Sequence, residues 1–191
     1  AKIENRSGVE HIDEICEIAD GIMVARGDLG VQLPTERIPL AQKHIISECR
    51  RLGKPVITAT QMLDSMIKNP RPTRAEVTDV ANAIYDGTDA IMLSGETANG
   101  KYPVESVKMM NAIAEETEKH INNQHRMEKL FNSDINSSIT NELCKVVTVT
   151  ANELTAKAIV TPTISGKTAK VISKYKPTVP VLALSKNACI F

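Results

Sequence analysis

The stretch Ile22-Met23-Val24-Ala25-Arg26-Gly27-Asp28-Leu29-Gly30 decides the fold that this sequence predicts. A short apolar run, typical of a strand, stops at an Arg-Gly-Asp, and a helical pattern follows. This order places the Asp28 carboxylate and backbone N–H groups at the carboxyl end of a strand. Such a corner can hold a metal ion and an anion together.

The same order, strand then helix, occurs four times in the first two-thirds of the chain. Each expected strand is a short and mostly apolar run, as in parallel strands that are covered on both faces. We expect strands at 2–4, 21–25, 55–60 and 90–94, with helical stripes at 9–18, 40–49, 77–84 and 104–120. We expect Ser7 to be the N-cap of the first helix.

Four β/α units are half the number that close a (β/α)8 barrel. The fold class that we predict is therefore α/β, with half of a TIM barrel followed by a partial C-terminal α/β domain. An open four-stranded α/β layer is the structural alternative. A half-barrel would leave the edges of its first and last strands unpaired, so we expect it to pair with another copy or with the other half.

Composition narrows the classes of function. The chain has 191 residues, of which 42% are hydrophobic and 24% charged, as in ordinary globular proteins. Aromatic residues make up 3% and there is no Trp, which argues against stacking on nucleic-acid bases. No apolar run is long enough to span a membrane. The cysteines fit no zinc or redox spacing, so we expect buried free thiols in a reducing compartment. They are Cys16, Cys49, Cys144 and Cys189.

A second unit is expected after a polar linker. We place the first unit at residues 1–122, the linker at 123–137 and the second unit at 138–191. The second unit should contain a helix at 139–154, a strand at 157–161, a helix at 167–175 and a strand at 181–184. Residues 1–120 carry 14 Lys+Arg against 19 Asp+Glu, whereas residues 121–191 carry 9 against 4. The basic second unit could therefore attract an anion or dock on the first unit.

The carboxyl ends of barrel strands meet at one mouth, and polar residues fall there. Glu4 and Asp28 are hard oxygen ligands that suit Mg²⁺ or Mn²⁺. Lys2 lies two residues from Glu4, on the same face of the strand, and supplies a cation for a phosphoryl oxygen or an enolate. Gly27 and Asp28 offer backbone N–H groups. Three more polar side chains lie at or just after the ends of later strands: Thr60, Ser94 and Glu96.

Each of these groups also has an ordinary interpretation. Lys2 and Glu4 could form a surface ion pair, the Arg-Gly-Asp could be only a turn, and Thr60 could simply end its strand. The coincidence of every polar cluster with the end of an expected strand favours the functional interpretation.

Several longer segments resemble the pyruvate kinase family, and the likeness is most specific up to about residue 120. They are Lys2-Ile-Glu-Asn5, Gly21-Ile-Met-Val-Ala-Arg-Gly-Asp-Leu-Gly-Val31, Lys54-Pro-Val-Ile-Thr-Ala-Thr-Gln-Met-Leu63, Pro70-Arg-Pro-Thr-Arg-Ala-Glu76, Asp79-Val-Ala-Asn82 and Ile91-Met-Leu-Ser-Gly-Glu-Thr-Ala98. The resemblance implies a cytoplasmic, tetrameric enzyme of glycolysis. It would transfer phosphate from phosphoenolpyruvate to ADP, giving pyruvate and ATP.

The resemblance also implies roles for individual residues. Glu4 and Asp28 would hold the divalent ion, and Lys2 would be the catalytic lysine. The backbone of Gly27 and Asp28, with Thr60, would bind the substrate carboxylate. Thr60 and Ser94 lie where the family delivers a proton to the enolate, and the donor is left open. Arg71 and Arg74 belong to a segment that lies near a subunit boundary in the family.

The family's amino-terminal half supplies the K⁺ site, much of the nucleotide site and a lid domain. None of these is in the present residues, so we expect the isolated chain to be inactive. The second unit resembles the C-terminal domain, which often binds a sugar-phosphate effector. Its candidate phosphate loop contains Thr163, Ser165, Gly166, Lys167 and Thr168. The other interpretation is an ordinary turn that Ser165 or Thr168 caps.

Two other functions stay open on the residues alone. One is a different metal-dependent barrel enzyme for phosphoenolpyruvate or 2-oxo acids, such as an aldolase or a lyase. The Thr-Ala-Thr-Gln and Leu-Ser-Gly-Glu-Thr-Ala runs argue against it. The other is a phosphate-binding regulatory or assembly module that acts through the basic second unit.

Overall fold

The computed structural model describes residues 1–122, 127, 131 and 138–186. The chain divides into two compact units, Ala1–Ile121 and Asn122–Phe191. The expected linker at 123–137 lies almost entirely outside the described residues, so its bounds stay a prediction.

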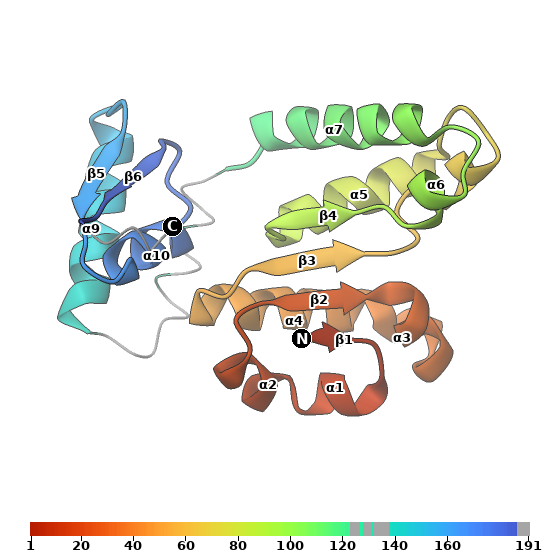
Figure 1. Cartoon of the computed structure of the whole chain (residues 1–191), viewed down its shortest axis with the longest axis horizontal. Coiled ribbons are helices and arrows are strands. Elements are labelled where there is room, and N and C mark those ends of the chain that lie inside the picture. Colours follow the sequence, from red (N-terminus) through yellow and green to blue (C-terminus); the bar gives the residue numbers. More distant parts are fainter. Residues whose placement is uncertain (123–126, 128–130, 132–137, 187–191) are drawn as a thin grey trace. The chain divides into compact units, whose positions relative to one another are not determined.

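The first unit is built on a parallel sheet of four strands in the order β1-β2-β3-β4. The strands are Lys2–Ile3, Ile22–Ala25, Val56–Ala59 and Ala90–Met92. Val24 lies opposite Ile3 and Thr58, which fixes the register across the first three strands. In Figure 1 the four arrows point the same way, so their carboxyl ends lie along one edge. The parallel α/β fold that the sequence predicts is confirmed, with strands one or two residues shorter than expected.

Helices alternate with these strands. The α-helices of the first unit are α1 (Arg6–Glu10), α2 (Ile12–Ile18), α3 (Arg26–Gln32), α4 (Ile38–Leu52), α5 (Arg74–Asp86), α6 (Gly95–Ala98) and α7 (Pro103–Lys119). Two short 3₁₀ turns are η1 (Thr35–Arg37) and η2 (Asp64–Ile67). Helix α3 begins directly after β2, and α6 begins shortly after β4, so both lie at the carboxyl edge of the sheet (Figure 1).

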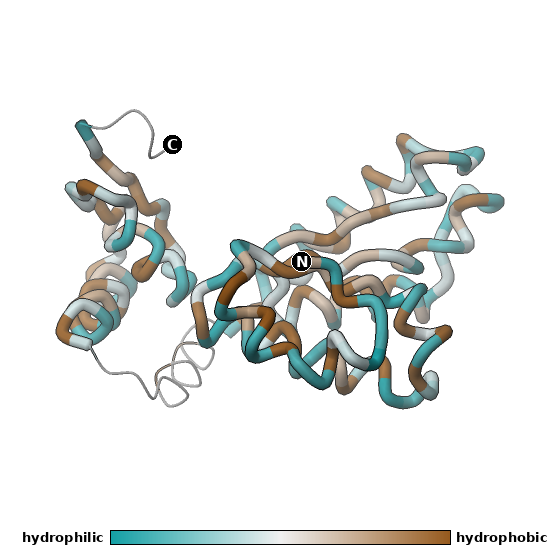
Figure 2. Tube along the Cα trace, turned by 60° about the horizontal axis from the view of Figure 1, so that its bottom comes forward, coloured by the Kyte–Doolittle hydropathy of each residue, from teal (hydrophilic) through white to brown (hydrophobic). Residues whose placement is uncertain are grey.

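Apolar residues of the first unit form two separate clusters. One joins β1, β2 and the start of β3 to α2 and α4, around residues such as Val24 and Ile46. The other joins η2 to α5 and α7, around residues such as Met66 and Val80. Figure 2 shows hydrophobic and hydrophilic segments alternating along the helices, as expected where one face of each helix is buried.

The start of the chain differs from the expected helix. Asn5, not Ser7, caps α1, because its side chain accepts a hydrogen bond from the Gly8 N–H at 2.8 Å. The helical stripe is also interrupted at His11, where α1 ends and α2 begins. Asn5 and Ser7 each carry a side-chain oxygen that can cap a helix, so the prediction named a suitable kind of residue but placed the cap two residues too late.

Three cysteines are buried free thiols, as predicted. The Cys16 and Cys49 sulfur atoms lie 3.9 Å apart between α2 and α4. Burial raises the pKa of Cys16, Cys49 and Cys144. Cys189 lies outside the described residues.

Helix α5 begins with a reciprocal capping box. The Thr73 hydroxyl accepts from the Glu76 N–H at 3.2 Å, and the Glu76 carboxylate accepts from the Thr73 N–H at 2.7 Å. The same carboxylate accepts from the backbone N–H and the hydroxyl of Ser65, at 2.7 and 2.6 Å. Partial burial opposes ionisation of Glu76, but the bonds from Ser65 and Thr73 prevail and lower its pKa. Glu76 thus ties the start of α5 to η2.

We expect Glu76→Gln to destabilise the chain by about 1–2 kcal/mol at pH 7, because an amide cannot accept all of these bonds. A carboxylate with a lowered folded-state pKa stabilises the fold above its unfolded pKa, near pH 4. That contribution is lost as the pH falls through the folded pKa. Urea unfolding of both proteins at several pH values should therefore show a difference that shrinks in acid.

The exposed Glu115→Gln serves as the control and should change the unfolding midpoint little at any pH. A difference between wild type and Glu76→Gln that stays constant down to pH 2 would contradict the ionic part of the prediction.

The second unit is a smaller α/β arrangement. Its elements are α9 (Ile139–Glu153), β5 (Ile159–Pro162), α10 (Lys167–Lys174) and β6 (Val181–Leu184). The two strands are parallel, with Ile159 opposite Val181. Its core includes Cys144, Ile172 and Tyr175. All four elements fall where the sequence places them, to within two residues.

Among the described residues, no helix combines the length and the apolar character that crossing a bilayer requires.

Candidate active site

Lys2, Glu4 and Asp28 converge at the carboxyl edge of the sheet. The Lys2 Nζ lies 2.5 Å from a Glu4 carboxylate oxygen and 2.9 Å from an Asp28 carboxylate oxygen. Lys2 is in β1, Glu4 follows it, and Asp28 lies in the first turn of α3 after β2. Because β1 and β2 are neighbours in the sheet, two carboxylates far apart in sequence meet at one ammonium group.

The two carboxylates keep Lys2 protonated. Hydrogen bonds to Glu4 and then Asp28 raise the pKa of Lys2 above its ordinary range. All three side chains are about half exposed, so the cluster is accessible to a ligand. At neutral pH Lys2 is therefore a cation and not a proton acceptor. This charge state suits a group that offsets the charge of a phosphoryl group or an enolate.

The arrangement fits a divalent cation. Glu4 and Asp28 already direct oxygen atoms at a single positive charge, that of Lys2. In the described part of the chain, no group of three or more His, Cys, Asp or Glu residues is placed to hold a metal ion. Two carboxylates are nevertheless enough for Mg²⁺, which usually keeps waters and takes substrate oxygens as its other ligands.

Thr60 contacts the same corner from the neighbouring strand. Its hydroxyl accepts a hydrogen bond from the Gly27 N–H at 2.8 Å and donates to the Ala59 carbonyl oxygen at 2.6 Å. The Gly27 N–H that was expected to bind a substrate carboxylate is thus engaged by Thr60 in this conformation. A Cβ at Gly27 would lie 3.3 Å from the Thr60 hydroxyl oxygen, so the close approach favours glycine.

The residues that follow β3 adopt an unusual backbone. Thr60 and Gln61 have φ angles of +69° and +50°, in the left-handed region that side chains rarely adopt. Such strain commonly occurs at functional sites, where the surrounding structure holds it in place. The pattern of the sequence gives no sign of it, because neither residue is Gly, Asn or Asp.

Arg26 is a residue of the site that the sequence did not reveal. Its guanidinium is buried and donates to the carbonyl oxygens of Thr60, at 2.9 and 3.2 Å, and of Gln61, at 3.0 Å. It also forms an ion pair of 2.6 Å with Asp79 on α5 and a hydrogen bond of 3.3 Å with Gln42 on α4. These partners are between 16 and 53 residues away, so no local signal could have identified the contacts.

Glu96 differs from the polar pair that it was expected to form with Ser94 at the mouth, because its side chain is buried. Glu96 is 1% exposed, and its carboxylate accepts from the backbone N–H groups of Leu63 and Ser94, at 2.9 and 2.8 Å. Glu96 therefore joins the end of β4 to the segment after β3. Within the described residues, the Ser94 hydroxyl makes no hydrogen bond to the other predicted site residues.

The candidate phosphate loop lies between β5 and α10. Gly166 is the N-cap of α10 with φ +76°, and its N–H donates to the Thr163 hydroxyl at 3.0 Å. Neither Ser165 nor Thr168 caps the helix, so the two predicted capping residues are wrong. The turn itself is closed by the Thr163 hydroxyl instead. Ser165 and Lys167 are exposed, whereas Thr163 is buried. The loop thus presents a hydroxyl and an ammonium group to solvent beside a helix start.

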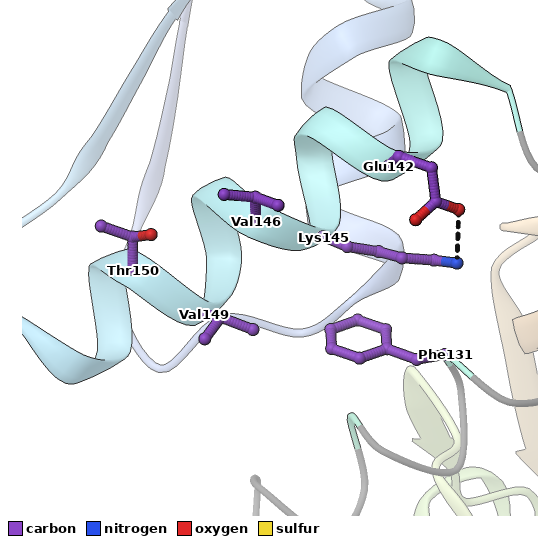
Figure 3. A pocket seen from close by; sticks show the side chains of 6 residues that line it. All are labelled: Phe131, Glu142, Lys145, Val146, Val149 and Thr150. Carbon is purple, nitrogen blue, oxygen red and sulfur yellow. Dashed lines mark hydrogen bonds and ion pairs between the residues drawn. The ribbon is translucent and has the colours of Figure 1, made fainter.

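A pocket elsewhere in the second unit contains none of these loop residues. It is lined by Phe131, Glu142, Lys145, Val146, Val149 and Thr150. Figure 3 shows all of these side chains except Phe131 along α9, with Lys145 paired to Glu142 at 2.9 Å and its chain beside the Phe131 ring. Arg71 and Arg74, the predicted interface residues, are both exposed, and Arg74 is the first residue of α5.

Two family models match this chain. The model described as "Pyruvate kinase, barrel domain" matches residues 1–107, and "Pyruvate kinase, alpha/beta domain" matches residues 141–190. The chain belongs to the pyruvate kinase family. The four-stranded sheet of the first unit is thus part of a pyruvate kinase barrel, and the resemblance found in the sequence is confirmed.

Individual relatives give the same result. The chain is 57% identical to a pyruvate kinase of Bacillus licheniformis over 189 residues, covering 99% of this chain and 32% of that protein. It is 56% identical to a pyruvate kinase of Geobacillus stearothermophilus, covering 100% of this chain and 32% of that protein. The chain spans about a third of the length of these curated relatives.

A solved structure supports the fold. The crystal structure of a pyruvate kinase from Cryptosporidium parvum superposes with a TM-score of 0.91 at 47% identity, covering 97% of this chain and 38% of that one. Together, the pyruvate kinase matches favour neither the aldolase or lyase reading nor a separate assembly module.

Proposed function

We propose that this chain supplies the metal-binding and phosphoryl-binding half of a pyruvate kinase active site. The complete enzyme would transfer phosphate from phosphoenolpyruvate to ADP, giving pyruvate and ATP. The observation that carries the proposal is the convergence of Glu4 and Asp28 on the Lys2 ammonium group. Phosphoryl transfer depends mainly on positioning and on offsetting negative charge, and this cluster is suited to both.

Glu4 and Asp28 would hold Mg²⁺ or Mn²⁺, which supplies charge that stabilises phosphoryl and enolate oxygens. Lys2 would bind a phosphoryl oxygen and later the enolate oxygen, since it stays protonated. Its position between the carboxylates keeps the ammonium group at the mouth. The K⁺ site of the family is expected in residues outside this chain.

Gly27, Asp28 and Thr60 would bind the substrate carboxylate. Because the Gly27 N–H donates to the Thr60 hydroxyl, a carboxylate that binds here would share this donor with the hydroxyl. Thr60 and Ser94 would contribute to proton delivery to the enolate from the ends of β3 and β4. The exposed hydroxyl of Ser165 and the ammonium group of Lys167 suit a phosphorylated effector, with Thr163, Gly166 and Thr168 shaping its loop.

Cellular context forms part of the proposal. We place the complete enzyme in the cytoplasm as a homotetramer, with Arg71 and Arg74 near a subunit boundary. Their exposure on the first unit is compatible with such a contact.

Two measurements on the purified chain test the proposal. A coupled pyruvate assay should detect no turnover, because two-thirds of the related enzymes' length lies outside this chain. A thermal shift with Mg²⁺ plus oxalate should nevertheless raise the melting temperature of the first unit.

A stabilising shift with a sugar bisphosphate alone would support the effector loop but not the metal corner. If neither ligand shifts the melting temperature, the proposal is contradicted. Turnover near that of an intact pyruvate kinase would contradict the expected inactivity.

A further inference from the structure

Arg26 lies next to the mouth in sequence, yet its side chain points into the protein. Residues Asp28 and Gly27 form the mouth corner, whereas the Arg26 side chain is only 8% exposed. Its planar fork of N–H donors meets two consecutive carbonyl oxygens on one side and the Asp79 carboxylate on the other. A guanidinium is the side chain best able to hold several acceptors at fixed angles.

The two carbonyl groups belong to the strained residues Thr60 and Gln61. Among the described residues, four non-glycine residues have positive φ: Thr60, Gln61, Thr155 and Lys176. Only the first two are consecutive, and the carbonyl oxygens of both accept hydrogen bonds from the same guanidinium. A left-handed conformation is unfavourable for a β-branched residue, so an external interaction must hold it.

The consequence of that conformation is the placement of a hydroxyl group. With Thr60 left-handed, its hydroxyl faces back toward the mouth corner and accepts from the Gly27 N–H. Thr60 thus connects the buried hydrogen bonds of Arg26 with the contact to Gly27 at the mouth.

We infer that Arg26 is a positioning residue: its hydrogen bonds hold residues 60–61 left-handed and thereby hold the Thr60 hydroxyl against Gly27. Arg26 itself contacts no ligand in this role. The positioning claim stands on the structure alone, and its effect on substrate binding rests on the proposed function.

Hydrogen exchange at the Gly27 amide, followed by NMR on the full chain, tests the positioning claim. In Arg26→Met the Gly27 amide should exchange at least about tenfold faster, because its acceptor is no longer held in place. The buried Val24 amide in β2 serves as the internal reference for an intact sheet. Thr60→Val removes the acceptor directly and should give a similar acceleration.

A second substitution separates positioning from simple loss of packing. Glycine adopts positive φ without a penalty, so Gln61→Gly should restore part of the Gly27 protection in the Arg26→Met background. The matched control is Lys176→Gly, because Lys176 has the same φ of +50° and lies in the second unit. This control should restore nothing.

Arg26→Lys covers the case in which Arg26→Met does not fold. It keeps a positive charge beside Asp79 but lacks the fork, so it should also accelerate exchange at Gly27. The inference is overturned if Gly27 stays protected in the folded Arg26 variants, or if Lys176→Gly restores protection as well as Gln61→Gly does.

Oxalate binding in the presence of Mn²⁺ tests the consequence for the ligand. Arg26→Met should keep Mn²⁺ affinity close to that of wild type but weaken oxalate on the order of tenfold or more, since small misplacements are costly. If wild type binds neither Mn²⁺ nor oxalate, the proposed function fails, while the amide exchange result still decides the positioning claim.

Discussion

Asp28→Asn should weaken Mn²⁺ binding by at least about 100-fold in the purified chain. Loss of an indirect partner of a metal ligand already costs 10–100-fold in affinity, and Asp28 would be a direct ligand. An amide keeps the shape of the side chain but removes one of the two negative charges, those of Glu4 and Asp28, at this corner. Titration followed by electron paramagnetic resonance, which separates free from bound Mn²⁺, measures the affinity directly.

The fold should not change in this variant. Asp28 is about half exposed and its ion pair with Lys2 is therefore worth little to stability. Asp13→Asn is the matched control, because Asp13 is an exposed carboxylate in the first turn of α2, away from Lys2. Equal Mn²⁺ affinity in wild type and Asp28→Asn, or an equal loss in Asp13→Asn, would contradict the assignment of Asp28 as a ligand.

Glu96→Ala should lower the free energy of unfolding by about 3–5 kcal/mol, which is more than we expect for the other substitutions described above. Its removal leaves the N–H groups of Leu63 and Ser94 without their acceptor inside the protein. It also leaves a cavity where a fully buried side chain had been. Urea unfolding at pH 7 measures the loss. The stability of Glu96→Gln should lie between that of wild type and that of Glu96→Ala, because an amide oxygen can still accept a hydrogen bond.

Glu118→Ala provides the comparison for this prediction. It removes an exposed glutamate near the end of α7 and should change the stability by less than about 0.5 kcal/mol. If Glu96→Ala unfolds at a urea concentration similar to that of Glu118→Ala, the two backbone bonds to Glu96 contribute little and the prediction is wrong.

Local sequence rules account for the strand ends and for the residues placed there. The apolar runs before Arg26 and Thr60 end where the strands end, because parallel strands covered on both faces contain little else. Lys2 and Glu4 could be placed on one face, since side chains alternate along a strand. The meeting of that face with Asp28 then required only that β1 and β2 be neighbours, which the βα order predicts.

Contacts between distant segments could not be predicted in this way. Glu96 looked like a mouth residue because it follows β4, but its burial depends on the turn after β3, more than thirty residues earlier. The role of Arg26 depends likewise on the carbonyl groups at 60–61 and on Asp79. Side-chain composition carries no record of which carbonyl oxygens face inward, because every residue has one.

The division of the first unit into two apolar clusters has a consequence for how it opens. Strand pairing and a polar seam join the clusters, the seam consisting of Arg26 with Asp79 and of Gln42 with Asp86. Segments with separate cores commonly unfold as separate cooperative blocks, or foldons. The α5–α7 block could therefore detach while β1 and β2 stay folded, and Arg26 would then lose its partner Asp79 before the mouth loses its carboxylates.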